Sequence, residues 1–157
     1  MPQFINPVTL AGIRAAILDL GRAMGTEGAA ARIVHRYDAV LGELAQRLDG
    51  ASRPRVLYWA DPHTAGAGTA IGSLVEAGGG TNVAREMGLS GIVPLAGERA
   101  FGADPDVFLV TLGSGASAAL RRHPLLSRTR AVREGRVVEM PNRLLVALSD
   151  RAADAAW

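Results

Sequence analysis

RVLYWADPHTAGAGTAIGSLVEAGG, residues 55–79, is the stretch that decides the fold. Its apolar start, residues 56–59, contains the β-branched and aromatic residues that are typical of a buried strand. A polar, glycine-rich turn follows, and apolar residues then recur at helical spacing from Ile71 to Val75 before a glycine pair ends the element. Strand, loop and helix in this order predict the first half of a βαβ unit. Ligands of such units bind beyond the carboxyl end of the strand.

The rest of the chain continues the alternation of helices and strands. Two helices are expected upstream, one that starts at Asn6-Pro7 and ends at Gly25, and one from about Glu27 to Leu48. Further strands are expected downstream at residues 92–95, 107–112 and 136–140, with short helices between them. This pattern predicts an α/β fold, a three-layer sandwich with a mostly parallel central sheet.

Composition excludes several kinds of chemistry. The chain has 157 residues, enough for one domain, and all 17 of its basic residues are arginine. Without lysine it has neither a Walker-type phosphate lysine nor a Schiff-base nucleophile. Without cysteine it has no thiolate metal site, thiol nucleophile or disulfide. Residues 1–3 lack the start of a signal peptide, and no apolar run approaches the ~20 residues that span a bilayer.

Five stretches, in order, resemble the C-terminal lobe of class III periplasmic binding proteins. They are NPVTLAGIRAAILDLGRAMGTEGAAARIV (6–34), PRVLYWAD (54–61), LVEAGGGTNVA (74–84), GERAFGADPDVFLV (97–110) and AVREGRVVEMP (131–141). This family delivers cobalamin, ferric siderophores or haem to ABC importers. The resemblance implies one Rossmann-like lobe of a bilobed protein, with a long inter-lobe helix in residues 1–25, a ligand-binding lobe in residues 26–157, and an N-terminal lobe absent from this chain.

The resemblance also implies a function and partners. It implies a non-enzymatic, periplasmic or otherwise extracytoplasmic binding protein without a cofactor of its own, whose ligand is an iron complex or cobalamin and whose partner is an ABC permease in the membrane. Glu98 resembles the family's docking glutamate, which would meet arginines of the permease. The alternative for Glu98 is a solvated carboxylate that complements a helix dipole.

Candidate ligand contacts lie in three loops that follow strands. They are Trp59, Asp61, His63, Thr64, Ser114, Asn142 and Arg143. Such a set suits a large, partly apolar ligand that is anchored by a few polar groups. Arg143 could pair with a ligand carboxylate, whereas Trp59 is equally well explained as a core residue. Asp61 and His63 are too few ligands for a protein-only metal site, so none is predicted, and His63 stays open as a single axial haem ligand.

Two other functions compete with transport. The Gly66–Thr69 loop would suit a small nucleotide-binding α/β enzyme if free amides at the following helix held a phosphate. The loop is longer than the tight dinucleotide turn, and Glu86 does not end a strand as the ribose-binding acid should. The arginines between residues 121 and 136 form a basic patch, but no aromatic residue lies between Phe108 and Trp157 to stack on bases, so no nucleic-acid partner is predicted.

A last hypothesis concerns the first helix. Its apolar stripe from Leu10 to Met24 would pack less completely without a second lobe. Partial exposure of this stripe or dimerisation through it is therefore the hypothesis, and sedimentation of the chain as a strict monomer would count against dimerisation.

Overall fold

The central layer is a parallel sheet. The computed structural model describes residues 9–142 and residue 145. Its four-stranded sheet has the order β3-β1-β5-β6, with all neighbours parallel. The strands are β1 (Arg55–Tyr58), β3 (Thr81–Asn82), β5 (Val107–Thr111) and β6 (Val137–Met140). A separate antiparallel pair joins β2 (His63–Ala65) to β4 (Ile92–Pro94). The predicted α/β fold with a mostly parallel sheet is confirmed.

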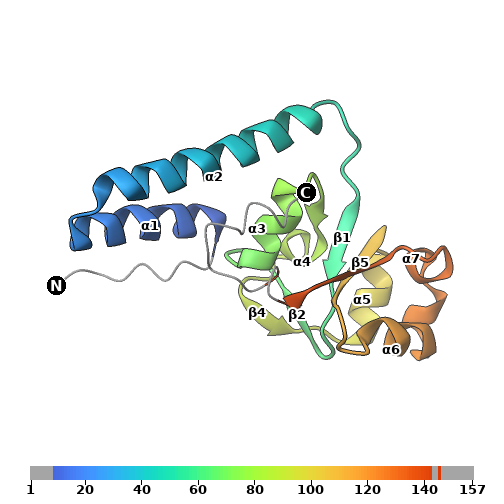
Figure 1. Cartoon of the computed structure of the whole chain (residues 1–157). Helices are drawn as coiled ribbons and strands as arrows, with labels where there is room; N and C mark the ends of the chain where they lie inside the picture. Colours follow the sequence, from blue (N-terminus) through green and yellow to red (C-terminus); the bar gives the residue numbers. More distant parts are fainter. Residues whose placement is uncertain (1–8, 143–144, 146–157) are drawn as a thin grey trace.

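Helices cover both faces of this sheet (Figure 1). They are α1 (Leu10–Met24), α2 (Glu27–Arg47), α3 (Ala70–Ala77), α4 (Val83–Glu86), α5 (Gly97–Ala103), α6 (Ala116–Arg122), the 3-10 turn η1 (Leu126–Arg128) and α7 (Arg130–Arg133). Within the described part of the chain, no helix is long and apolar enough to cross a bilayer.

Alternating side chains divide the strands between two cores. Leu57 of β1 and Phe108 of β5 point to one face, where they pack with α4, α5, α6, η1 and α7. Tyr58 and Leu109, their immediate neighbours in sequence, point to the other face and pack with Ile71 of α3. This period of two is the pattern of a strand that is buried on both sides.

The helices α1 and α2 form an antiparallel pair that stands apart from the sheet. The helix α3 lies between this pair and the sheet (Figure 1). Leu10, Ile13 and Tyr37 pack there against Leu74 of α3. The described helix begins at Leu10 because the side chain of Thr9 accepts a hydrogen bond from the Gly12 amide over 3.0 Å. The predicted start at Asn6-Pro7 lies outside the described residues.

The predicted long inter-lobe helix in residues 1–25 corresponds to α1, which has 15 residues, whereas α2 has 21. The division of the chain at residue 25 stays a prediction. The stripe on α1 is buried at its start, but Leu20 and Met24 near its end are 60% and 65% exposed. These two side chains are what the dimer hypothesis would bury, and that hypothesis also stays a prediction.

Tyr37 gives the α1–α2 pair a measurable pH dependence. Its buried hydroxyl donates a hydrogen bond to the Leu10 carbonyl over 3.0 Å. Burial, and secondarily the Asp38 carboxylate, raise the pKa of Tyr37 from 10.0 to about 12. The neutral phenol therefore adds stability that is fully present below pH 10 and is lost as the pH rises through about 12.

We expect this loss to be roughly 2 kcal/mol of the free energy of unfolding. Urea denaturation followed by circular dichroism across this pH interval measures it, as the difference between the wild type and Tyr37→Phe. An unchanged alkaline loss in Tyr37→Phe would contradict the assignment.

Candidate ligand-binding site

The loops that carry the predicted ligand contacts meet at one edge of the sheet. Because β1, β5 and β6 are adjacent and parallel, the segments that follow them lie side by side. We call this the carboxyl edge, and it comprises residues 59–63, 112–115 and 141–142. Side-chain and main-chain bonds hold the strand ends together: the Tyr58 hydroxyl lies 3.1 Å from the Thr111 hydroxyl, and the Leu112 amide donates to the Met140 carbonyl over 2.8 Å.

The first loop is a tight turn with Asp61 at its tip. The Ala60 amide donates to the His63 carbonyl over 2.9 Å, and the His63 amide donates back to the Ala60 carbonyl over 2.7 Å. The Leu95 amide, next to β4, donates to the Pro62 carbonyl over 2.8 Å and ties the turn to the small sheet. The side chains of Asp61 and His63 are exposed. This turn therefore presents one carboxylate and one imidazole to solvent on a fixed backbone.

Two residues predicted to contact ligand are buried instead. Trp59 is 2% exposed and packs with Leu57 in the core that faces α4 to α7. Thr64 is fully buried, and its hydroxyl donates to the Tyr58 carbonyl over 2.8 Å. Neither side chain is exposed to a ligand as predicted, because both are buried in the fold. Trp59 is a core residue, which was the alternative expected for it.

The second and third loops differ in what they offer. The Ser114 hydroxyl is exposed but engaged, because it donates to the Thr111 carbonyl over 2.6 Å and accepts from the Ala116 amide over 3.2 Å. A ligand would compete with this turn for the hydroxyl. Asn142 is exposed at the end of the third loop, and Arg143 lies outside the described residues.

Two apolar side chains at this end of the molecule were not predicted as contacts. Leu112 follows β5 directly, and Ile92 lies on β4 opposite Ala65 of β2. Both are exposed, although each was assigned to a strand in the sequence and so expected to be packed. Exposed apolar groups beside a few polar ones are what a large, partly apolar ligand needs.

Several amides of the Gly66–Thr69 loop and of the helix that follows it already form hydrogen bonds within the fold. The Gly66 amide donates to the Gly91 carbonyl and the Ala67 amide to the Leu89 carbonyl, each over 2.9 Å. At the start of α3 the Thr69 hydroxyl caps the Gly72 amide over 3.0 Å. These three amides are therefore not available to a nucleotide phosphate, which counts against the alternative of a nucleotide-binding enzyme.

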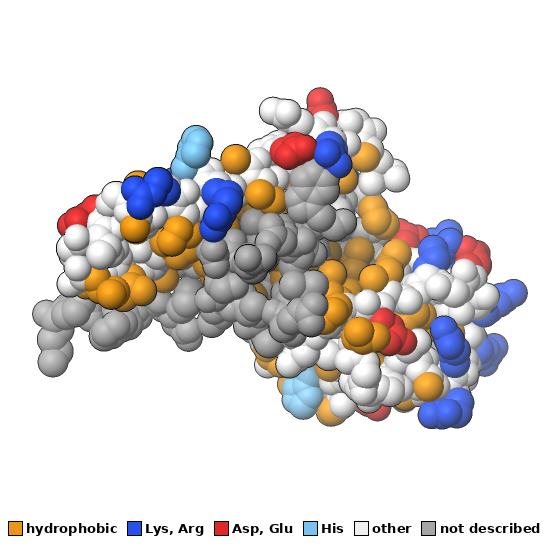
Figure 2. Space-filling model, viewed as in Figure 1, with side chains coloured by type: hydrophobic (Ala, Val, Ile, Leu, Met, Phe, Trp, Pro, Cys, Tyr) orange, Lys and Arg blue, Asp and Glu red, His pale blue; other side chains and the backbone are white. Residues whose placement is uncertain are grey.

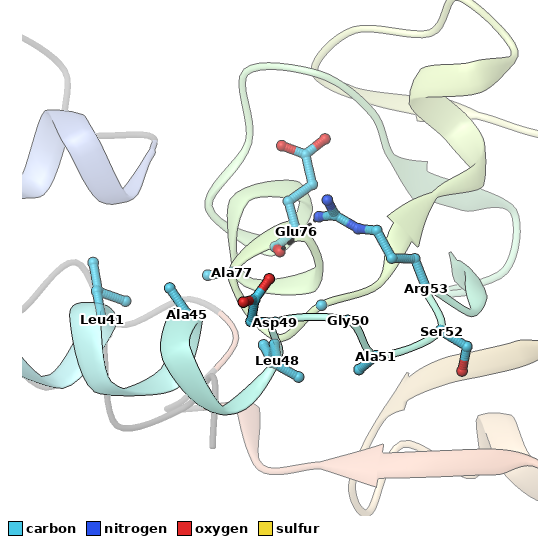
Figure 3. Close-up of a pocket in the computed structure, with 11 residues that line it drawn as sticks. Leu41, Ala45, Leu48, Asp49, Gly50, Ala51, Ser52, Arg53, Glu76 and Ala77 are labelled. Carbon is cyan, nitrogen blue, oxygen red and sulfur yellow. Dashed lines mark hydrogen bonds between the residues drawn. The ribbon is translucent and has the colours of Figure 1, made fainter.

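A possible metal site and the position of a cavity bear on where a ligand could bind. Among the described residues, no group of three or more His, Asp or Glu side chains could hold a metal ion. A cavity of about 450 Å³ lies instead between the end of α2, the turn that follows it and the end of α3 (Figure 3). The Arg53 guanidinium donates there to the Glu76 carbonyl over 3.5 Å. This cavity is next to the start of β1, so it lies away from the carboxyl edge.

Glu98 is exposed in the first turn of α5 and makes no ion pair with another described residue. The preceding residue, Gly97, lies against the imidazole of His123, which a Cβ atom there would approach to 2.8 Å. The His123 Nδ1 atom in turn accepts from the amides of Leu125 and Leu126 over 3.2 Å and 3.1 Å. Packing thus fixes the backbone under Glu98 and leaves its carboxylate in solvent.

A parallel sheet with helices on both faces, and exposed polar and apolar groups gathered beyond its strand ends, defines an α/β ligand-binding domain. The sequence profile of the periplasmic binding protein family matches residues 3–144. The chain belongs to this family. Its members are binding proteins rather than enzymes.

Similar proteins have names that refer to tetrapyrrole ligands. A cobalamin-binding protein of Halobacterium salinarum is 30% identical over 145 residues, which cover 87% of this chain and 39% of that protein. The apo periplasmic haem-binding protein RhuT of Roseiflexus sp. RS-1 superposes with a TM-score of 0.81 at 26% identity, over 96% of this chain and 60% of RhuT. The haem-binding protein BhuT in complex with two haems gives 0.80 at 27% identity, over 94% of this chain and 59% of BhuT. The chain thus spans less than two thirds of the length of these proteins.

Proposed function

We propose that this chain is the C-terminal lobe of the substrate-binding component of an ABC importer. The observation that carries the proposal is the family match over residues 3–144, combined with a carboxyl edge that exposes Asp61, His63 and Asn142 beside apolar Leu112. The ligand would lie between this edge and a second lobe. Membership of the family supports an extracytoplasmic location and a membrane permease as partner.

The cargo class that we infer is a metal complex, namely cobalamin, haem or a ferric siderophore. The similarity to a cobalamin-binding protein and to two haem-binding proteins supports this inference. The metal would arrive as part of the cargo, since the described side chains offer no cluster that could hold a free ion. His63 is the described residue at the carboxyl edge that could ligate a haem iron.

Fluorescence titration tests the cargo class. In a Trp157→Phe background, Trp59 is the remaining tryptophan, and it lies two residues from Asp61. We expect cyanocobalamin, haem or a ferric siderophore to quench it saturably with one molecule per chain, and only weakly in affinity because one lobe forms half of the pocket. The absence of saturation with all three would contradict the proposal.

Two variants separate parts of this proposal. His63→Ala should remove a haem-induced shift of the Soret band if His63 ligates iron, and should leave quenching by cobalamin unchanged. Glu98→Gln should leave every titration unchanged, because Glu98 is not among the residues proposed to contact the ligand, but should lower uptake in cells that carry the importer. Uptake at the wild-type level in Glu98→Gln would argue that Glu98 is only a solvated helix residue.

A further inference from the structure

The basic charge of the chain is concentrated in one segment. Residues 116–133, which form α6, η1 and α7, contain five arginines and no acidic residue. The whole chain has 17 arginines and 15 acidic residues, so acidic residues outnumber arginines everywhere else taken together. Figure 2 shows the arginine side chains gathered at the end of the molecule where α6 and α7 lie. We call this surface the arginine face; it comprises Arg121, Arg122, Arg128, Arg130 and Arg133.

Most of these guanidinium groups are not neutralised by the fold. All five side chains are exposed. Arg130 pairs with Asp106 over 2.5 Å, and the neighbouring Glu134 is used by Arg136. Arg121, Arg122, Arg128 and Arg133 make no ion pair with any described residue. Four like charges held on short, packed elements repel one another, and a surface of opposite charge would relieve that repulsion.

An aromatic side chain lies beside the arginine face. Phe101, at the end of α5, is 37% exposed. It lines an open cavity of about 700 Å³ together with Arg128, Arg130 and Arg133. An exposed apolar ring among guanidinium groups suits a partner that has apolar material directly beneath a layer of anions. A lipid surface has this layered chemistry, with phosphates above acyl chains.

We propose that the arginine face binds the headgroup phosphates of an anionic lipid surface. A guanidinium group matches a phosphate with paired donors, and each arginine adds independently to the attraction. A free phosphate ion fits less well, because the carboxylates of Asp104 and Glu134 line the same cavity and would repel a small dianion inside it. A lipid surface meets the guanidinium groups from outside and does not enter the cavity.

The position of the arginine face leaves the cargo site free. The cavity lies where α5 and α7 approach the starts of β5 and β6, so it is at the opposite end of the strands from the carboxyl edge. Contact with lipid and contact with cargo could thus occur together. The proposal takes the nearness of a membrane from the proposed function, but the binding itself depends only on the arginine face.

Sedimentation with lipid vesicles tests this proposal without cargo or permease. We expect the full chain to sediment with vesicles made of equal parts phosphatidylglycerol and phosphatidylcholine at low ionic strength. It should stay in solution with vesicles of phosphatidylcholine alone, and high salt should release it, because screening shortens the reach of surface charges. The double variant Arg128→Gln/Arg133→Gln should bind the anionic vesicles about 25-fold more weakly, since each arginine near such a surface is worth about fivefold.

The matched control is Arg32→Gln/Arg53→Gln, which removes the same charge from α2 and the turn after it. It should bind vesicles nearly as the wild type does. Equal weakening in both double variants would mean that net charge alone drives binding and would overturn the proposal. So would calorimetric binding of inorganic phosphate, or binding of double-stranded DNA, without vesicle binding. A chain that binds anionic vesicles but no cargo would support this inference while contradicting the proposed function.

Discussion

Gly66→Ala is expected to cost about 3 kcal/mol or more of the free energy of unfolding, or to prevent folding. A Cβ atom on Gly66 would lie 2.2 Å from the carbonyl oxygen of Leu89 and 2.9 Å from the amide nitrogen of Ser90. Both obstacles are main-chain atoms, and the strand-like bonds from Gly66 to Gly91 and from Ala67 to Leu89 hold them in place. Overpacking costs 1–3 kcal/mol even where flexible side chains can yield, so a backbone clash should reach or exceed the upper end. Urea denaturation followed by circular dichroism measures the loss.

The control for this variant is Gly42→Ala. Gly42 lies in the exposed interior of α2, and a Cβ atom there meets nothing within 4 Å. Alanine should stabilise this helix by about 0.5–1 kcal/mol, because glycine has the higher conformational entropy in the unfolded chain. If Gly66→Ala matched the wild type in stability, the close packing of residues 66 and 89 would be refuted.

Asn82→Ala is the second large loss that we expect, at about 3 kcal/mol. The Asn82 side chain is buried, and its Nδ2 atom donates to the Ala65 carbonyl over 3.0 Å. Its Oδ1 atom accepts from the Ala84 amide over 3.0 Å and from the Arg85 amide over 3.4 Å, so it caps α4. Alanine removes the cap and leaves two buried main-chain groups and the partly buried Arg85 amide without this partner, and both effects are destabilising.

Denaturation of Asn82→Ala beside Asn142→Ala separates this role from a general effect of asparagine. Asn142 is exposed, so its replacement should change stability by less than about 0.5 kcal/mol. A loss in Asn82→Ala of under about 1 kcal/mol would show that water replaces the three bonds. In that case the side chain of Asn82 would contribute little to stability, and other contacts would have to hold the glycine-rich loop against α4.

Local sequence patterns predicted the main strands and helices because those patterns reflect packing. The run from residue 107 to 110 is apolar throughout, as expected for a strand buried on both faces, and it forms β5 together with Thr111. The strand β2 was missed because His63 to Ala65 has neither alternation nor an apolar run. Its partner β4 is some thirty residues away, and only the folded chain brings the two together. Asn6 and Thr9 both satisfy the N-cap rule, so local sequence does not rank them, and the described helix has Thr9 as its N-cap.

The candidate site was less predictable than the fold. Trp59 was considered equally suited to ligand contact and to the core, although the period of two from Leu57 places both on the same face. That signal could have assigned Trp59 to the core. The sequence gives no indication that Leu112 is exposed, because an apolar residue just after a buried strand cannot be distinguished from the apolar residues within it. The role of Gly66 could not be predicted either. In the sequence, a glycine that allows two backbone segments to approach closely cannot be distinguished from a glycine that allows a turn.

The turn at Asp61 has a consequence for binding kinetics. Main-chain bonds close it at Ala60 and His63, and a further bond from Leu95 fixes Pro62, so the turn is ordered before any ligand arrives. A preordered rim loses little conformational entropy on binding and requires no folding step during encounter. Cargo molecules of similar size should therefore associate with this rim at similar rates. Discrimination between them should lie in the residence time, set by how quickly each complex dissociates.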